Sequence, residues 1–164
     1  MSKVAYIALG SNLGDPIAHI QFAFKELETL SQTPVRQSSI WRSTPVDCPP
    51  GSPDFINAAA AIKPLTEETP ETLLGKLQAL EINAGRQPKV VMNEPRPLDL
   101  DIIAFGAEQR SSAELTIPHP RFHERSFVLK PLAEIAPGVV FPGHIQSIAE
   151  MLDALAPNDT LIRL

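Results

Sequence analysis

The order of the apolar segments is the feature of this sequence that most constrains its fold. Four short runs are predicted as strands: residues 4–9, 35–41, 55–62 and 98–105, of which residues 4–9 are apolar and partly β-branched, as is typical of a buried strand. After Asp15-Pro16, apolar residues recur every three or four positions, which predicts an amphipathic helix between the first two runs. A second helix is predicted from Thr69-Pro70 to Gly85, between the last two runs.

Strand, helix, strand, strand, helix, strand is the order of the split β-α-β unit of ferredoxin-like proteins. We therefore expect an α+β fold in which helices pack on one antiparallel sheet. Two more helices are predicted near residues 127–135 and 145–155, and Gly10-Ser11-Asn12 is predicted as a turn after the first strand. The 164 residues suit a single domain that spans residues 1–164.

Charge and cysteine content narrow the class of protein. A net charge of −5 argues against general binding to nucleic acids or membrane surfaces. The single cysteine, Cys48, excludes an intramolecular disulfide and suits a reducing compartment. No basic and then apolar leader opens the chain, and no apolar run reaches the ~18 residues of a membrane helix. We expect a cytoplasmic protein.

The most informative motif is the stretch of residues 96–103, in which two aspartates alternate with apolar residues. On a strand, Asp99 and Asp101 point to one face, and Leu98, Leu100 and Ile102 point into the core. Two neighbouring carboxylates repel each other unless a cation binds between them, and oxygen ligands suit magnesium. The alternative is a solvated strand face that pairs with arginines.

A basic cluster follows in residues 118–125, a loop fixed by two prolines. It contains His119, Arg121, His123 and Arg125, side chains that form charge-assisted hydrogen bonds with polyphosphates. The alternative is an ordinary surface loop whose arginines pair with Glu124 and Glu134. Beside an aspartate pair, however, the cluster indicates metal–phosphate chemistry.

A third group contains residues 44–46 and 55–59. Asn57 is a polar residue in an apolar strand, and its amide matches the edge of a heterocycle. Phe55 and Phe127 have the aromatic rings needed to stack on a flat ring. The alternative is that Asn57 caps a turn and both phenylalanines belong to the core.

Three motifs together resemble one family, the 6-hydroxymethyl-7,8-dihydropterin pyrophosphokinases of folate biosynthesis. They are Gly10-Ser11-Asn12-Leu13-Gly14, Arg96-x-Leu98-Asp99-Leu100-Asp101-Ile102 and Pro118-His119-x5-Arg125-x-Phe127-Val128-Leu129-x-Pro131-Leu132. The resemblance extends from about residue 3 to about residue 142, with the motifs in the family's order and spacing. It implies Mg²⁺-dependent transfer of pyrophosphate from ATP to the pterin hydroxymethyl group, with release of AMP.

The resemblance also implies a role for each matching residue. Catalytic roles fall to Asp99, Asp101, Arg96 and Arg86, and the two aspartates are the ligands of two expected magnesium ions. The implied ATP-binding residues are Glu81, Arg86, Arg96, Ile102, His119, Arg125, Leu115 and Thr116. The implied pterin-binding residues are Gly10, Thr44, Pro45, Val46, Phe55, Asn57, Asp99 and Phe127. The expected partners are small molecules, without nucleic acid or membrane, and the chain is expected to be a monomer.

The segment of residues 83–96 departs from the family pattern, because Met92 and Asn93 stand where many members carry arginine and tryptophan. We expect slower turnover or weaker substrate binding as a result, with residues 90–92 as a simpler apolar cover. Two other functions stay open: a non-catalytic regulatory module that binds nucleotide or pterin, and the same chemistry on a different hydroxymethyl heterocycle. Because the chain ends near the expected domain end, we expect no fused folate enzyme.

Overall fold

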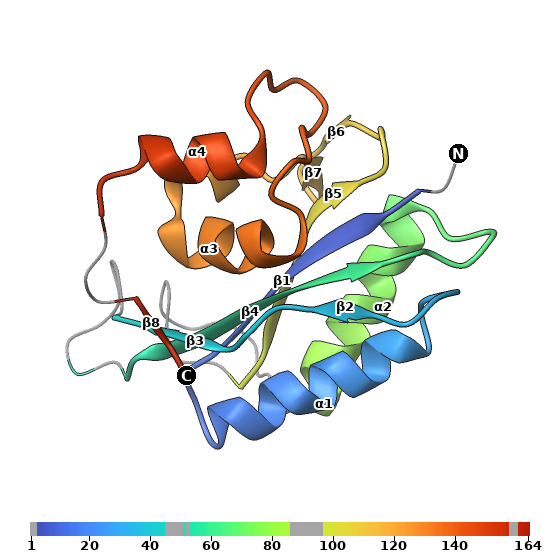
Figure 1. The fold of residues 1–164 in the computed structure, drawn as a ribbon. Coiled ribbons are helices and arrows are strands. Elements are labelled where there is room, and N and C mark those ends of the chain that lie inside the picture. The colour runs from blue at the N-terminus through green and yellow to red at the C-terminus, as the bar shows by residue number, and fades with distance from the viewer. Residues whose placement is uncertain (1–2, 45–50, 52, 86–96, 158–160) are drawn as a thin grey trace.

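The computed structural model describes residues 3–44, 51, 53–85, 97–157 and 161–164 (Figure 1). The main sheet has the strand order β5-β1-β4-β3-β8, with β2 also paired to β4, and every pairing is antiparallel. Its strands are β1 (Ala5–Ser11), β2 (Arg36–Gln37), β3 (Trp41–Ser43), β4 (Phe55–Ile62), β5 (Asp99–Phe105) and β8 (Ile162–Arg163). A second, two-stranded sheet consists of β6 (Arg110–Ser111) and β7 (Thr116–Ile117).

The helices are α1 (Pro16–Glu28), α2 (Pro70–Asn83), α3 (Ser126–Ile135) and α4 (Ile148–Ala154), and a single 3-10 turn, η1, covers Phe122–Glu124. In the main sheet β1 lies between β5 and β4, so the two β-α-β halves interleave as the split unit requires. The predicted α+β fold, with helices packed on one antiparallel sheet, is confirmed. Within the described residues, no helix has the length and apolar character needed to cross a membrane.

Local capping signals place the first two helices where the sequence predicts them. The Asp15 carboxylate accepts a hydrogen bond from the Ala18 amide, and Pro16 occupies the first turn of α1. Thr69 and Thr72 form a reciprocal capping box at the start of α2, which is followed by Gly85 in the left-handed region at φ +100°. Short-range hydrogen bonds thus fix where both helices begin.

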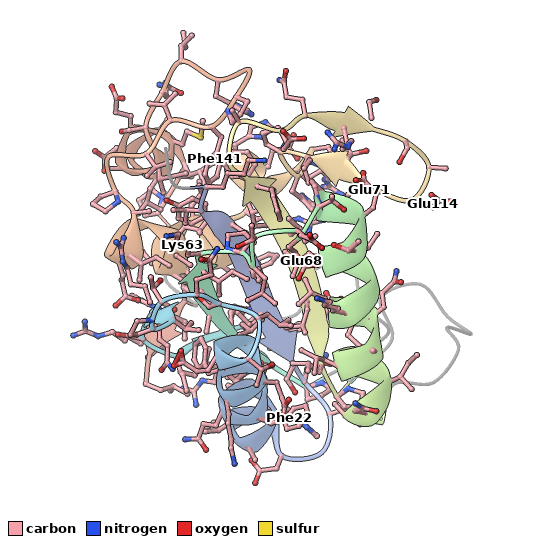
Figure 2. All side chains as sticks on the ribbon, turned by 90° about the vertical axis from the view of Figure 1, so that its right-hand side faces the viewer. Phe22, Lys63, Glu68, Glu71, Glu114 and Phe141 are labelled. Atoms are coloured by element: carbon pink, nitrogen blue, oxygen red, sulfur yellow. The ribbon has the colours of Figure 1, made fainter. Side chains whose placement is uncertain are left out.

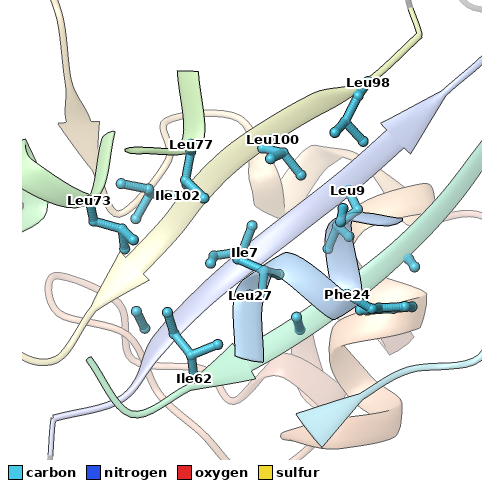
Figure 3. Packing of buried hydrophobic residues seen from close by; sticks show 14 of the residues in the cluster. Ile7, Leu9, Phe24, Leu27, Ile62, Leu73, Leu77, Leu98, Leu100 and Ile102 are labelled. Carbon is cyan, nitrogen blue, oxygen red and sulfur yellow. The ribbon is translucent and has the colours of Figure 1, made fainter. Parts of the chain in front are cut away.

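Helices cover both faces of the sheet, α1 and α2 on one side and α3 and α4 on the other (Figure 1). Alternate strand residues therefore belong to two separate cores. Figure 3 shows the first core, in which residues of β1 and β5 pack against Phe24, Leu27, Leu73 and Leu77 of the two helices. The second core lies under α3 and α4 and includes Tyr6, Ile103, Phe122, Leu129 and Phe141.

Three predicted boundaries are wrong. The expected strand of residues 35–41 is interrupted, because the Ser38 hydroxyl accepts a hydrogen bond from the Ala59 amide at 2.8 Å, in place of a backbone carbonyl. The pairing therefore breaks into β2 and β3. Gly10 and Ser11 do not form a turn but extend β1, since they pair with Asn57 and Ile56 of β4. The last helix is also shorter than predicted, beginning at Ile148 after a Ser147–Glu150 capping box.

Polar contacts fix α2 beside the edge strand β5. Figure 2 shows Glu68 and Glu71 at the beginning of α2, drawn in green. The buried Glu68 carboxylate accepts hydrogen bonds from the Thr72 hydroxyl and from Lys76 Nζ, the latter at 2.9 Å. Glu71 pairs with Arg110 Nε of β6 at 2.8 Å. The far end of α2 is held beside the aspartates of β5 by a separate contact, in which Glu81 accepts a hydrogen bond from the Leu100 amide.

Candidate active site

One row of residues crosses three strands at the α3 side of the sheet. Gly10 of β1 is paired with Asp99 of β5 on one side and with Asn57 of β4 on the other. Directly paired residues share a face of the sheet, so the Asp99 carboxylate and the Asn57 amide both stand on this face. With one strand between them, the backbones of Asp99 on β5 and Asn57 on β4 are about 10 Å apart. Because Gly10 has no side chain, nothing on the middle strand separates the two polar groups.

The next row contains Asp101, Ala8 and Ala59 in the same order across the sheet. Asp101 therefore lies on the same face as Asp99, one pleat further along β5. Both aspartates are half-exposed, whereas Leu98, Leu100 and Ile102 are at most 4% exposed. The predicted alternation, with carboxylates on one face and apolar side chains in the core, is confirmed.

Glu81 binds to the peptide between the two aspartates. Its Oε2 accepts a hydrogen bond from the Leu100 amide at 2.7 Å, and the side chain is buried. This amide points outward from the edge strand β5, where no further strand follows in the sheet order. The geometry thus gives Glu81 a role in fixing β5 through a backbone contact, and its expected contact with ATP stays a prediction.

His119 lies beside the outer edge of β5. Its amide donates to the Ile103 carbonyl at 2.8 Å, and its Nδ1 accepts from the Arg121 amide at 3.1 Å. Burial lowers the pKa of His119 to about 4, helped by the charges of Arg125 and Arg121 and opposed by Asp99. The imidazole is therefore neutral near pH 7. Since Nδ1 accepts, the hydrogen is on Nε2, which is available to donate to an anion.

Arg125 and Phe127 lie at the start of α3. The guanidinium carbon of Arg125 is 5.8 Å from the centre of the Phe127 ring, a cation–π contact. Among the described residues, no carboxylate lies within ion-pair distance of Arg125. Arg121 instead pairs with Glu124 at 3.3 Å, as the surface-loop alternative expected. That alternative is wrong for Glu134, whose carboxylate accepts from Ser39 and from Trp41 Nε1.

Phe55 and Asn57 lie next to Gly10 on the opposite side from the aspartates. A Cβ atom built on Gly10 would be 3.6 Å from Asn57 Nδ2 and 3.7 Å from Phe55 Cδ1. The Asn57 Oδ1 accepts a hydrogen bond from the Ser43 hydroxyl at 2.7 Å, and both residues are buried. Asn57 therefore does not cap a turn, and this part of the alternative is wrong.

Ser43 is a polar residue of this face that the sequence reasoning missed. The signal that could have revealed it is the alternation along β3, in which Trp41 and Ser43 are buried and Arg42 is exposed. Had residues 41–43 been assigned to the strand, Ser43 would have been placed on the same face as Trp41, beside Asn57. The predicted strand ends at residue 41 and therefore does not include Ser43.

Some predicted site residues lie elsewhere or outside the described residues. Ile102 and Leu115 bury their side chains in the first core, so an ATP contact from either would involve mainly its backbone. Thr116 is half-buried on β7, where it pairs with Ser111, and Thr44 is exposed just after β3. The assignments of Pro45, Val46, Arg86 and Arg96, and the substituted segment of residues 88–95, fall outside the described residues.

The arrangement separates two kinds of chemistry on one face. On one side are two carboxylates, a neutral imidazole donor and a guanidinium without a carboxylate partner among the described residues, groups that suit a metal-bound polyanion. On the other side an aromatic ring and a buried amide suit the face and the edge of a flat polar heterocycle. The glycine between them lets two such ligands approach each other.

Comparisons with known proteins show the family of this chain. Residues 6–137 match the family model of 7,8-dihydro-6-hydroxymethylpterin-pyrophosphokinase (HPPK). The chain is 43% identical over 155 residues to the 2-amino-4-hydroxy-6-hydroxymethyldihydropteridine pyrophosphokinase of Haemophilus influenzae, with 94% of each chain covered. It is 40% identical over 165 residues to the enzyme of that name from Pseudomonas aeruginosa, covering 98% of it.

Solved structures show the same fold at low sequence identity. The wild-type HPPK-DHPS of Plasmodium falciparum superposes with a TM-score of 0.69 over 93% of this chain, at 12% identity. A structure of HPPK-DHPS in complex with substrates gives a TM-score of 0.70 at 10% identity. The chain spans less than half of these proteins, 41% and 44% of their lengths. A folic acid synthesis protein of Pneumocystis carinii is likewise longer, with 21% of it covered at 38% identity.

Proposed function

Because this chain belongs to the 7,8-dihydro-6-hydroxymethylpterin-pyrophosphokinase family, we propose that it transfers pyrophosphate from ATP to 6-hydroxymethyl-7,8-dihydropterin, with release of AMP. The chain is a pyrophosphokinase of folate biosynthesis, and the proposal concerns its two substrates and its metal. The single observation that supports it most is the row Asp99–Gly10–Asn57. It places a phosphate-side carboxylate and a heterocycle-side amide on either side of a residue without a side chain.

The pterin is proposed to bind beside Gly10, with its edge on Asn57 and its ring between Phe55 and Phe127. The Asn57 amide is buried and points toward Gly10. A ring edge bound there would give this buried donor a hydrogen-bond acceptor. Phe55 is within van der Waals reach of the same position. This placement directs the hydroxymethyl group of the pterin along the row toward Asp99.

The ATP phosphates are proposed to bind at the β5 side of the row. His119 donates from Nε2 to a phosphate oxygen without a charge of its own, because its lowered pKa keeps it neutral. Arg125 supplies a positive charge that no described carboxylate neutralises, and its guanidinium already contacts the Phe127 ring. Arg125 therefore connects the proposed phosphate site to a ring proposed to stack on the pterin, which favours simultaneous binding of both substrates.

The donor set around β5 fits magnesium. Two part-exposed carboxylates on one strand face provide hard oxygen ligands, and the described residues contain no group of three or more His, Cys, Asp or Glu side chains placed to hold a metal ion by themselves. An ion bound there would take its other ligands from phosphate and water, as Mg²⁺ does in nucleotide sites. We propose that Asp99 and Asp101 bind two such ions, which would neutralise charge on the phosphate oxygens.

The proposed reaction forms one bond and breaks one. The pterin hydroxymethyl oxygen bonds to the β-phosphorus of ATP, while the bond from that phosphorus to the α–β bridging oxygen breaks. AMP leaves with the bridging oxygen, the two terminal phosphates move as one unit, and the hydroxyl proton is released. His119 and Arg125 stabilise charge on the phosphate oxygens, and Asn57 and Phe55 orient the attacking group.

The state of the protein in the cell is also part of the proposal. We propose one domain over residues 1–164, acting as a monomer in the cytoplasm on small-molecule substrates without nucleic acid. Support comes from the main sheet, whose described strands extend from residue 5 to residue 163. The family match itself covers residues 6–137.

The test is a chromatographic assay of nucleotide products with ATP, Mg²⁺ and 6-hydroxymethyl-7,8-dihydropterin. AMP that accumulates in step with pterin consumption, and stops on removal of Mg²⁺ with a chelator, is the expected result. Asp101→Ala should abolish turnover, whereas Glu114→Ala, an exposed carboxylate away from β5, should have no effect. Formation of ADP would refute pyrophosphate transfer, and turnover of another hydroxymethyl heterocycle alone would refute the substrate.

A further inference from the structure

The hydrogen bond between Ser43 and Asn57 is buried inside the proposed heterocycle site. Ser43 Oγ donates to Asn57 Oδ1 at 2.7 Å, and the two residues are 3% and 5% exposed. They belong to neighbouring strands, Ser43 to β3 and Asn57 to β4, whose pairing joins Trp41 to Asn57 and Ser43 to Phe55. The contact is therefore a diagonal one on the face that carries the site.

This bond determines which end of the Asn57 amide faces the ligand. An asparagine amide has one acceptor end and one donor end, and rotation by half a turn exchanges them. With Oδ1 bound to Ser43, the donor atom Nδ2 points toward Gly10, 3.6 Å from the place of a Cβ atom there. The donor end of the amide is thus the end that faces the position proposed for the ligand.

The reversed amide is disfavoured by the burial of Ser43. In that orientation Nδ2 would face Ser43 Oγ, and the hydroxyl hydrogen would need another acceptor. Among the described residues, the only acceptor of the Ser43 hydroxyl is Asn57 Oδ1. A buried hydroxyl hydrogen without a partner costs more than an ordinary hydrogen bond contributes, so the observed orientation is the stable one.

We propose that Ser43 is a positioning residue that selects the heterocycle by fixing the donor end of Asn57 toward it. A ring edge that presents an acceptor at this point, a carbonyl oxygen or an unprotonated ring nitrogen, is then paired. A ring edge that presents an amino group there places its own donor against the Asn57 Nδ2 donor and therefore binds poorly. This inference rests on the proposed function, since it assigns the part of the site that recognises the pterin edge.

The experiment compares Ser43→Ala and Ser43→Thr with the wild type in steady-state kinetics. Ser43→Ala frees the amide to rotate, so the KM for the pterin should rise about tenfold, while the KM for ATP and kcat change less than about twofold. Ser43→Thr keeps the hydroxyl and should restore the KM for the pterin to within about threefold of wild type. An equal rise in both KM values, or no rise in either, would overturn the proposal.

A second measurement separates positioning from loss of structure. Thermal unfolding of each variant reports stability, and Ser43→Cys offers a near-isosteric side chain with a weaker donor in case Ser43→Ala does not fold. From lowest to highest, the expected order of the KM for the pterin is wild type, Ser43→Thr, Ser43→Cys and Ser43→Ala, whatever the order of Tm. If KM instead followed Tm across the series, Ser43 would have only a structural role.

Direct binding keeps this test independent of the proposed reaction. Calorimetric titration of the pterin into wild type and Ser43→Ala, with a non-hydrolysable ATP analogue and Mg²⁺ present, gives Kd without turnover. Pterin binding in this titration, together with no AMP formation in the separate assay with ATP, would refute the proposed function and leave the Ser43 effect measurable as a change in Kd. The same Kd for the two proteins would refute the role of Ser43 and leave the proposed function intact.

Discussion

The low pKa of His119 makes the stability of the fold depend on pH in a defined direction. The folded pKa is about 4, against 6.5 for an unperturbed histidine, with burial as the main cause. Below pH 6.5 the unfolded chain therefore binds a proton that the folded chain does not, so acidification favours unfolding. For these two values the linkage relation gives about 2 kcal/mol between pH 7 and pH 5. Because the imidazole is only partly buried, solvent screening reduces our expectation to about 1 kcal/mol.

The perturbation that isolates this effect is His119→Asn. The Asn Oδ1 replaces Nδ1 as the acceptor of the Arg121 amide, so the local hydrogen bond is kept and only the titration is removed. Urea unfolding of both proteins at pH 7 and pH 5 gives two losses of stability on acidification. The loss should be about 1 kcal/mol smaller in the variant, because carboxylates common to both proteins cancel.

Proton NMR gives an independent measurement of the same quantity. The imidazole resonance of His119, identified by its absence in His119→Asn, should titrate near pH 4 in the apoprotein. A midpoint above pH 6, or equal losses of stability in the two proteins, would refute the assignment of His119 as a buried neutral donor. The proposed contact with phosphate through Nε2–H would then have to be replaced by a charged one.

Three further substitutions test other parts of the site. Gly10→Ala should leave the fold intact, since its methyl group makes ordinary contacts at 3.6 to 3.9 Å, and a thermal melt tests this. The methyl group should cover the Asn57 amide and weaken pterin binding about tenfold, which calorimetry measures. Glu134→Ala removes the acceptor of the buried Trp41 Nε1, 2.6 Å away. The free energy of unfolding should fall by about 2 kcal/mol, and Tm by about 4–8 °C; an unchanged Tm would contradict this. Arg125→Ala should weaken ATP binding by about tenfold or more, and by more than pterin binding, in titrations with a non-hydrolysable analogue; the reverse pattern would remove Arg125 from the phosphate side.

Glu134 connects the stability of the fold to the geometry of the site. It lies near the end of α3 and accepts three hydrogen bonds from the segment that leads into β3, two from Ser39 and one from Trp41. The beginning of the same helix carries Phe127, and β3 carries Ser43. The contact thus fixes the helix that bears one proposed pterin residue against the strand that bears another.

Local patterns in the sequence are sufficient to predict several parts of this protein. The alternation of Asp99 and Asp101 with apolar residues predicts which side chains leave the core, because side chains along a strand alternate between faces. The capping residues Asp15 and Thr69 predict where α1 and α2 begin, because a capping bond spans only about three residues. Each of these features depends on neighbours along the chain.

The tertiary structure decided what depends on residues far apart in sequence. Strand register placed Gly10 between Asp99 and Asn57, although the local sequence predicted a turn there. Ser38 broke a predicted strand through a bond to Ala59, 21 positions away. Backbone hydrogen bonds between strands are the same for nearly all residue types, so they do not select a register. The register depends on how the side chains on each face of the sheet pack. The sequence by itself determined the chemical groups of the site, and packing of the sheet decided which of them meet.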